Sequence, residues 1–235
     1  MENYINKVIE IVDLSQNKPL NEIIYKGLRE AIIIGIIPVG AHINEKAYAD
    51  YMNISRTPIR KAIERLKQEE LIEYKPNYGA VVKKVTVDDA KEFYEIRKIL
   101  DVLATTKAMD IMDNDDFKKM ERYISKANMA HSIGDADTVI EASAEFNRLM
   151  YQFAKMPKLI IIIDQLREYL SRFRNISLYD KQRRAIALHE HELIFKNMKA
   201  GNKDEVTKII NKHLDDSLTF VTKEIIAFDK GLNSD

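Results

Sequence analysis

The chain has 235 residues, 46% of them hydrophobic, and its 37 basic side chains balance its 37 acidic ones. A chain of this length and apolar content can bury a sizeable core and is expected to form two domains. The sequence has no cysteine, which excludes disulfides, thiolate zinc sites and cysteine nucleophiles. No apolar run reaches membrane length and residues 1–4 lack the basic start of a secretion signal, so we expect a soluble cytoplasmic protein.

The first helices of the chain are short and separated by turns. Apolar residues recur at helical spacing over residues 20–33, and this predicted helix ends near Gly35. A turn at residues 38–40 leads to a second short helix, which starts at Asn44 or Glu45 and ends at a turn around Asn53. This order of two short helices before a third is typical of a helix-turn-helix unit.

Residues 54–66 form the third predicted helix and are the most informative stretch of the sequence. Ser55 or Thr57 can cap its start, and Pro58 suits the first turn. Its inward stripe is apolar: Ile59, Ala62, Ile63 and Leu66. Its outer face carries arginines: Arg56, Arg60 and Arg65. Guanidinium groups and hydroxyls beside a helix N-terminus suit a DNA major groove, although a solvated basic face, with Arg65 paired to Glu69, is the simpler alternative.

A small hairpin is predicted directly after this helix. Residues 71–74 and 80–83 have the composition of short strands, and residues 75–79 form the tip between them. Residues 54–84 hold eight basic and four acidic side chains, so a local positive patch exists although the net charge of the chain is zero. Three helices followed by a two-stranded wing predict a winged helix-turn-helix DNA-binding domain.

Residues 18–84 resemble the GntR family of bacterial transcription regulators, through Pro38 to Glu45, Ser55 to Ala62 with Leu66, and Leu71 to Val82. The resemblance implies that the DNA contacts lie at the second helix, the recognition helix and the wing tip: Lys46, Ser55, Arg56, Thr57, Arg60, Asn77 and Gly79. The chain departs from the family pattern at two positions. Lys46 stands where arginine is usual, and Glu70 replaces the usual glycine between the recognition helix and the wing.

The rest of the chain predicts an antiparallel bundle of about six amphipathic helices with short connections. Asp88 or Asp89 is expected to cap the first of them. Its inward stripe is expected to be apolar: Phe93, Ile96, Ile99, Leu100 and Leu103. A later helix is expected to turn Ile186 and Leu188 inward. The predicted fold is therefore mainly α, with an extension at residues 1–17, a winged helix-turn-helix domain at 18–85 and a helical effector-binding and dimerisation domain at 86–230.

This second half resembles the FCD effector domain of the FadR-like branch of the same family, through residues 95–101, 190–194, 201–204 and 213–214. Many such domains bind a divalent metal with an aspartate, a histidine four residues later and two more histidines. His191 and His213 match the last two. Ser143 and Asn147 stand where the aspartate and the first histidine are expected, and both are poor ligands for Zn, Ni or Mn. Metal binding by Asn147, His191 and His213, or direct hydrogen bonding of an effector by these three residues, therefore both remain open.

Arg97 lies on the inward side of the first bundle helix and requires an anion there. That anion is either the carboxylate of a bound effector or an ion-pair partner such as Glu141, Glu145 or Asp101. The resemblance implies a small-molecule effector, and it favours an organic acid. Among the other arginines of the bundle, Arg174 is the only one that we would test for a role at the effector site.

The sequence as a whole predicts a homodimeric transcription regulator, expected to be a repressor, that binds a double-stranded DNA operator and responds to a carboxylate metabolite. It is not expected to be an enzyme or to bind a membrane. The alternatives are a metal-dependent helical-bundle enzyme that uses its N-terminal segment for dimerisation, and an architectural DNA-binding protein without an effector. The sequence lacks the paired glutamate and histidine motifs that a metal-dependent enzyme of this kind needs. An architectural role would leave the inward polar residues without an explanation.

Overall fold

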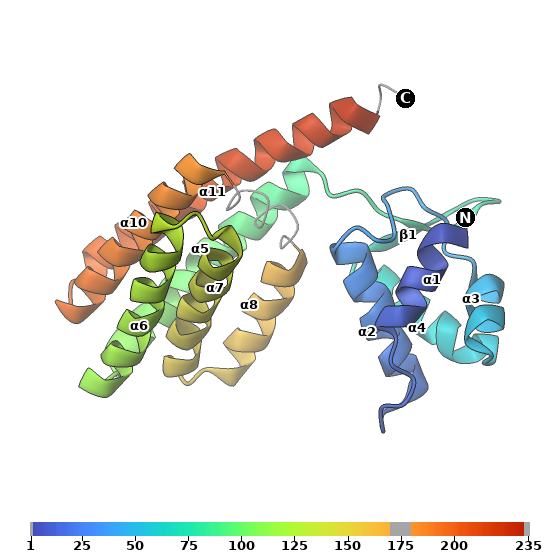
Figure 1. The fold of residues 1–235 in the computed structure, drawn as a ribbon, viewed down its shortest axis with the longest axis horizontal. Coiled ribbons are helices and arrows are strands. Elements are labelled where there is room, and N and C mark those ends of the chain that lie inside the picture. The colour runs from blue at the N-terminus through green and yellow to red at the C-terminus, as the bar shows by residue number, and fades with distance from the viewer. Residues whose placement is uncertain (1, 170–179, 233–235) are drawn as a thin grey trace. The chain divides into compact units, whose positions relative to one another are not determined.

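The computed structural model describes residues 2–169 and 180–232, so Arg174 lies outside the described residues. The chain divides into two compact units, Met1–Val85 and Thr86–Asp235. Figure 1 shows the elements of both units in chain order, from the blue N-terminal helix to the red C-terminal one.

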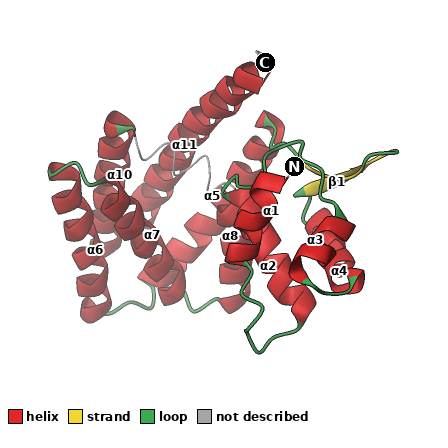
Figure 2. Ribbon diagram, turned by 45° about the vertical axis from the view of Figure 1, so that its right-hand side comes forward, coloured by secondary structure: helices red, strands yellow, loops and turns green. Residues whose placement is uncertain are grey.

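The first unit is a winged helix-turn-helix, which confirms the predicted fold class. It contains α1 (Glu2–Ile11), α2 (Leu20–Ile33), α3 (Glu45–Met52), α4 (Arg56–Gln68), β1 (Ile72–Lys75) and β2 (Gly79–Val82). The two strands, yellow in Figure 2, are antiparallel, with Ile72 opposite Val82 and Lys75 opposite Gly79. All four residues of the stripe expected on α4 are buried.

The N-terminal extension forms a helix that contributes to the core of this unit. Ile5 and Val8 of α1 are buried, as is Val12, which directly follows α1. A Cβ atom at Gly27 on α2 would lie 2.3 Å from a methyl group of Val12. Since such a contact is too short for any real side chain, the glycine allows the end of α1 to approach the backbone of α2.

Side-chain capping explains where α3 begins, but α4 begins without it. The Asn44 side chain accepts hydrogen bonds from the backbone N–H groups of Lys46 and Ala47, so Asn44 caps α3 as predicted. Ser55 occupies the corresponding position before α4, but its side chain makes no capping hydrogen bond. The Ser55 hydroxyl is therefore not used to close its own helix.

Glu70 follows the recognition helix with a left-handed backbone, at a φ of 58°. A residue with a Cβ atom is strained in this region, which glycine enters without cost. Its carboxylate accepts a hydrogen bond from Lys83 at 2.8 Å, but this surface ion pair is largely exposed and contributes little. The departure from the usual glycine therefore leaves local strain between α4 and the wing.

We expect Glu70→Gly to raise the free energy of unfolding of the winged-helix unit by about 1 kcal/mol, because it removes the Cβ atom from a left-handed position. Calorimetry of the full chain measures the change as a higher transition temperature. The matched control is Glu70→Ala, which also loses the ion pair but keeps the Cβ atom and should not be stabilised. Equal transition temperatures for the two variants would contradict the strain argument.

The second unit is a helical bundle, as predicted. Its described helices are α5 (Val87–Met109), α6 (Asn114–Ser132), α7 (Ala136–Phe153), α8 (Pro157–Tyr169), α10 (Lys181–Lys199) and α11 (Lys203–Leu232). Helix α5 packs against α7, α8, α10 and α11, and α6 packs against α7 and α10. Among the described residues, no helix is both long enough and apolar enough to cross a membrane.

The inward face of α5 differs from the prediction. Ile96, Ile99 and Leu103 are exposed, and Phe93 and Leu100 are only half-buried. The buried face instead carries small, aromatic and polar residues: Ala90, Tyr94, Arg97, Asp101, Ala104, Thr105 and Ala108. Helix α5 is in contact with four other helices, and small side chains on its inner face allow their close approach. The predicted stripe was therefore wrong.

Two smaller expectations are also corrected. Thr86, not Asp88 or Asp89, caps α5, and Asp89 completes a capping box by accepting from the Thr86 backbone N–H at 2.8 Å. Ile186 is exposed on α10, while Leu188 is buried as expected.

Candidate nucleic-acid interface and effector pocket

The start of the recognition helix α4 presents the predicted DNA-reading residues to solvent. Ser55, Arg56, Thr57 and Arg60 are exposed, and Lys46 is exposed on α3. The buried stripe of α4 fixes this orientation, because residues on the opposite face must then point outward. These side chains are available for phosphates and base edges.

Glu45 links the two arginines of this surface. One of its oxygens, Oε2, lies 3.1 Å from Nη2 of Arg56 and 3.3 Å from Nη2 of Arg60. The Glu45 side chain is mostly buried while both arginines are exposed. The carboxylate thus holds two guanidinium groups from neighbouring turns of α4 at one place, an arrangement that sequence reasoning missed.

Arg65 is engaged within the unit. Its guanidinium carbon lies 3.7 Å above the ring of Tyr25, and its Nε lies 3.7 Å from Oε1 of Glu69. The pairing with Glu69 that the sequence offered as an alternative is therefore present. Arg65 is thus paired within the unit, although its side chain remains 51% exposed.

The wing tip depends on backbone conformations that few residues adopt. Asn77 has a φ of 60° and Gly79 a φ of 90°. A Cβ atom at Gly79 would lie 2.8 Å from Nε2 of His42, whose ring also packs edge-on against Tyr78. Asn77 is exposed at the tip, where the sequence predicts a minor-groove contact. The DNA contacts of the wing and of α4 remain predictions.

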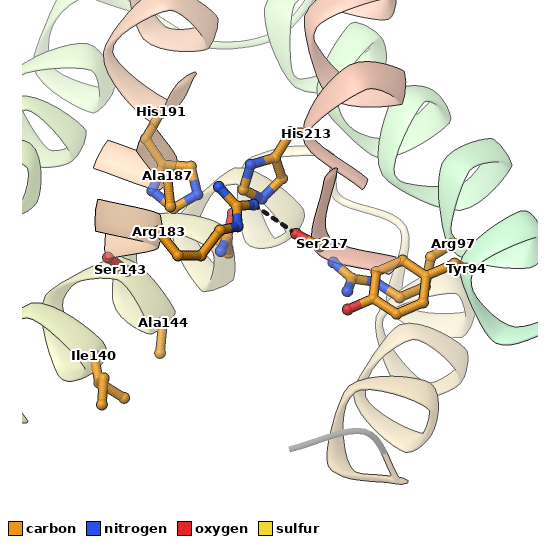
Figure 3. Close-up of a pocket in the computed structure, with 11 residues that line it drawn as sticks. Tyr94, Arg97, Ile140, Ser143, Ala144, Arg183, Ala187, His191, His213 and Ser217 are labelled. Atoms are coloured by element: carbon orange, nitrogen blue, oxygen red, sulfur yellow. Dashed lines mark hydrogen bonds between the residues drawn. The ribbon is translucent and has the colours of Figure 1, made fainter. Parts of the chain in front are cut away.

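In the second unit, a cavity of about 40 Å³ lies among α5, α7, α10 and α11. The described residues that line it are Tyr94, Arg97, Ile140, Ser143, Ala144, Asn147, Arg183, Ala187, His191, His213 and Ser217. The structure therefore brings together every residue that the sequence assigned to the effector or metal site. Figure 3 shows these side chains converging from the surrounding helices.

Arg97 is buried and forms an ion pair within α5. Its Nη2 lies 2.9 Å from Oδ2 of Asp101, and the Tyr151 hydroxyl donates to Oδ1 of Asp101 at 3.0 Å. Burial alone would lower the pKa of Arg97, but the charge of Asp101 raises it above its usual value. Of the ion-pair partners that the sequence allowed, Asp101 is the one present. Arg97 still lines the cavity, so the ion pair does not remove it from the site.

Arg183 is a second buried arginine of the pocket, and sequence reasoning missed it. Its Nη1 lies 3.2 Å from Oε2 of Glu190, and its Nη2 donates to the Ser217 hydroxyl at 2.9 Å. Figure 3 shows the Arg183 side chain extended toward α11, with its guanidinium at Ser217. Its spacing of four from Ala187 and eight from His191 placed it on the inward face of the same helix, which is the signal that could have identified it.

Glu190 joins this arginine to His213. The same oxygen, Oε2, lies 2.7 Å from Nδ1 of His213. Burial alone would raise the pKa of Glu190, but the hydrogen bond with His213 and the charge of Arg183 lower it to about 2. Burial and the neighbouring Glu190 raise the pKa of Asp216. Glu190 is thus ionised at neutral pH and orients both the arginine and the histidine.

The two histidines of the site lie next to each other. The ring centroids of His191 and His213 are 5.1 Å apart, and His191 also stacks on Phe146 with a centroid distance of 5.1 Å. Ser143 and Asn147 complete this side of the cavity from α7. The predicted clustering of these four positions agrees with the geometry.

This donor set fits a tightly bound divalent metal poorly. Within residues 2–169 and 180–232, no group of three histidine, aspartate or glutamate side chains is placed to hold a metal ion. Ser143 and Asn147 offer only a hydroxyl and an amide, and Glu190 is already bound to Arg183. A metal beside His213 would also face the permanent positive charge of Arg183.

Two family models match the chain. The model described as "Bacterial regulatory proteins, gntR family" matches residues 20–82, and the model of the FCD domain matches residues 92–216. Together they cover most of the winged-helix unit and most of the bundle that contains the cavity.

Individual proteins of similar length match as well. The HTH-type transcriptional regulator YdhC of Bacillus subtilis (strain 168) is 26% identical over 80% of this chain and 85% of its own. The HTH-type transcriptional repressor RspR of Escherichia coli (strain K12) is 24% identical over 86% of this chain and 88% of its own. The solved structure of E. coli McbR/YncC superposes with a TM-score of 0.68 at 20% identity, over 88% of this chain and 99% of that one, which shows a shared fold.

Proposed function

Because the chain belongs to the GntR family of bacterial transcription regulators and carries an FCD effector domain, we propose that it is a metabolite-controlled repressor acting in the cytoplasm. Its operator affinity would depend on a small organic acid bound in the bundle cavity. The chain is a transcription regulator by family.

The charge of the cavity lining supports an acid as the effector. Among the described residues, eleven line the cavity, and none of them has a carboxylate while two are arginines. Asp101 and Glu190 hold these arginines but are not part of the lining. A ligand in this cavity therefore meets hydrogen-bond donors and guanidinium groups, which favour an anion.

The DNA-binding part of the proposal assigns roles to named residues. Arg56 and Arg60, with Ser55 and Thr57, would enter the major groove, while Asn77 and Gly79 would bring the wing to the minor groove. Lys46 would contact a phosphate. With a net charge of zero, the chain would depend on specific contacts of two copies at two half-sites more than on bulk attraction.

Control by the ligand requires a difference between two arrangements of the dimer. The acid must bind more tightly to the arrangement that releases DNA than to the one that binds it. Helix α5 is the proposed transmitter, because it carries Arg97 and follows the connection to the winged-helix unit directly. A helical-bundle enzyme would not need two dimer arrangements that differ in ligand affinity. Neither the family matches nor the relatives support that alternative.

The test begins by selecting operator fragments from genomic DNA with the purified full chain. We expect one or a few near-palindromic fragments to be bound, and a panel of small organic acids to contain one that weakens this binding by about 5- to 150-fold, the usual range of allosteric coupling. Fluorescence anisotropy at fixed salt measures the change. Failure to select any fragment would contradict the DNA-binding role, and an operator affinity insensitive to every acid would contradict the proposed effector class.

A further inference from the structure

We propose that the bundle cavity binds a small dicarboxylate without a metal, with one carboxylate at Arg97 and the other at Arg183. This inference rests on the proposed function, because it names the chemistry of the effector at that same site. Arg183 is then a ligand-binding residue.

The two arginines approach the cavity from different helices. Arg97 comes from α5 and Arg183 from α10, and only 6% and 8% of their surfaces are exposed. Each is held by one carboxylate outside the lining, Asp101 for Arg97 and Glu190 for Arg183. These ion pairs fix both guanidinium groups before a ligand arrives, which lowers the ordering cost of binding.

Both arginines have unused hydrogen-bonding capacity. Within the described parts of the chain, neither Nε of Arg97 nor Nε of Arg183 has a hydrogen-bond partner, although both atoms are buried. A buried donor without a partner is costly, and a guanidinium group has five N–H donors to satisfy. A carboxylate at each arginine would supply the missing acceptors, so two carboxylates match the site better than one.

The remaining lining restricts the size and shape of the acid. A cavity of about 40 Å³ has room for roughly three water molecules, which indicates a short ligand. Neutral polar side chains from α7 and α11 also line the cavity: Ser143, Asn147 and Ser217. They can donate to carboxylate oxygens that the arginines leave free, while Ala144 and Ala187 face the short carbon chain.

Arginine supplies the positive charge that a metal would otherwise bring to the site. Oε2 of Glu190 already lies 3.2 Å from Arg183 and 2.7 Å from His213. The positive charge that attracts a carboxylate at this end of the cavity is therefore the guanidinium of Arg183 itself. His191 and His213 then act as hydrogen-bonding walls of the site.

The test compares acids of equal chain length by calorimetry on the full chain with EDTA present. The probes are malonate and succinate, with propionate and butyrate as the matched monoacids. We expect the better diacid to bind at least 10-fold more tightly than its monoacid, because the second charge-assisted contact is lost in the monoacid. Equal affinities, or no binding of either diacid, would overturn the proposal.

Variants at each arginine locate the two contacts. Arg97→Gln and Arg183→Gln should each lower diacid affinity at least 10-fold and remove the preference over the monoacid. Since glutamine removes the positive charge that faces Asp101 or Glu190, Arg97→Lys and Arg183→Lys serve as variants that keep the ion pair but lose the planar fork. They should also lose most of the preference. The control is Arg122→Gln, an exposed arginine on α6, which should bind like the unaltered chain. A diacid preference that survives in both variants at either arginine would overturn the proposal.

Metal analysis and DNA binding separate the remaining outcomes. Protein purified without chelator should hold no stoichiometric metal, and added Zn²⁺ should change diacid affinity less than 2-fold. Stoichiometric metal that disappears in the His191→Ala, His213→Ala variant would overturn the metal-free site. The same preparations are tested on the operator. Normal DNA binding without diacid binding would refute only the dicarboxylate, whereas loss of all specific DNA binding would refute the proposed function.

Discussion

Replacement of both Arg56 and Arg60 by alanine is expected to weaken operator binding by about 100-fold or more, because each arginine that reads a base contributes about 1–3 kcal/mol. The two side chains are exposed at the start of α4 and share Glu45 as their partner. Neither contributes to the buried stripe, so the winged-helix unit should remain folded. Anisotropy titrations at one salt concentration measure the operator affinity.

The control for this variant removes the same number of charges from the same helix. Lys61 and Lys67 are exposed on α4, and their double alanine variant should lose only the part of the affinity that depends on salt. The bundle of the arginine variant should bind acids like the unaltered chain. Operator binding equal to that of the lysine variant would show that α4 does not read DNA in the proposed way.

A second large effect is expected from Ile99→Asp, which should convert a dimer into monomers. Ile96, Ile99 and Leu103 recur at helical spacing on α5 and are 38%, 71% and 44% exposed. The neighbouring helix α8 adds two exposed isoleucines, Ile161 and Ile162. Exposed apolar side chains along one face of α5 suit contact with a second copy of the chain, and a carboxylate among them would be costly to bury.

Light scattering and sedimentation at micromolar concentration measure the molecular mass. The control is Met129→Asp on α6, an apolar residue of similar exposure on a different helix, which should remain dimeric. Operator affinity should fall by 100-fold or more in Ile99→Asp, since two linked half-site contacts become separate binding events. A monomeric unaltered chain, or a dimeric Ile99→Asp variant, would contradict this interface.

The winged-helix unit was predictable because its sequence signals agree with one another. On α4, the four apolar residues recur with helical spacing and are all buried, and the Asn44 cap marks the start of α3. The strands were placed within one residue of their observed bounds. Local rules suffice here because each short helix has one inward face.

Helix α5 could not be predicted in the same way, because apolar residues occur on two of its faces. The face with the larger apolar residues is exposed, and the buried face holds small residues together with Arg97 and Asp101. A hydrophobic pattern selects the face with more apolar surface, which in an assembling protein can be the face that meets a partner. Which face enters the bundle depends on the positions of four other helices.

The candidate pocket was also predictable only in part. Arg97, Asn147, His191 and His213 were identified from helical spacing and resemblance, and all line one cavity. Arg183 was not assigned to the site, and the contacts of Glu190 with Arg183 and His213 were not foreseen, because these contacts join side chains that are separated along the chain. Spacing within one helix indicates the inward face, but only the packed structure identifies the partner on another helix.

The capping box at the start of α5 has a practical consequence for protein engineering. Thr86 and Asp89 satisfy each other's backbone N–H groups, and both residues follow Val85, where the first compact unit ends. The bundle therefore supplies the hydrogen bonds that close its own first helix. Joined at this point to a different DNA-binding unit, the bundle retains that closure, which makes the junction between Val85 and Thr86 a natural site for building chimeric biosensors.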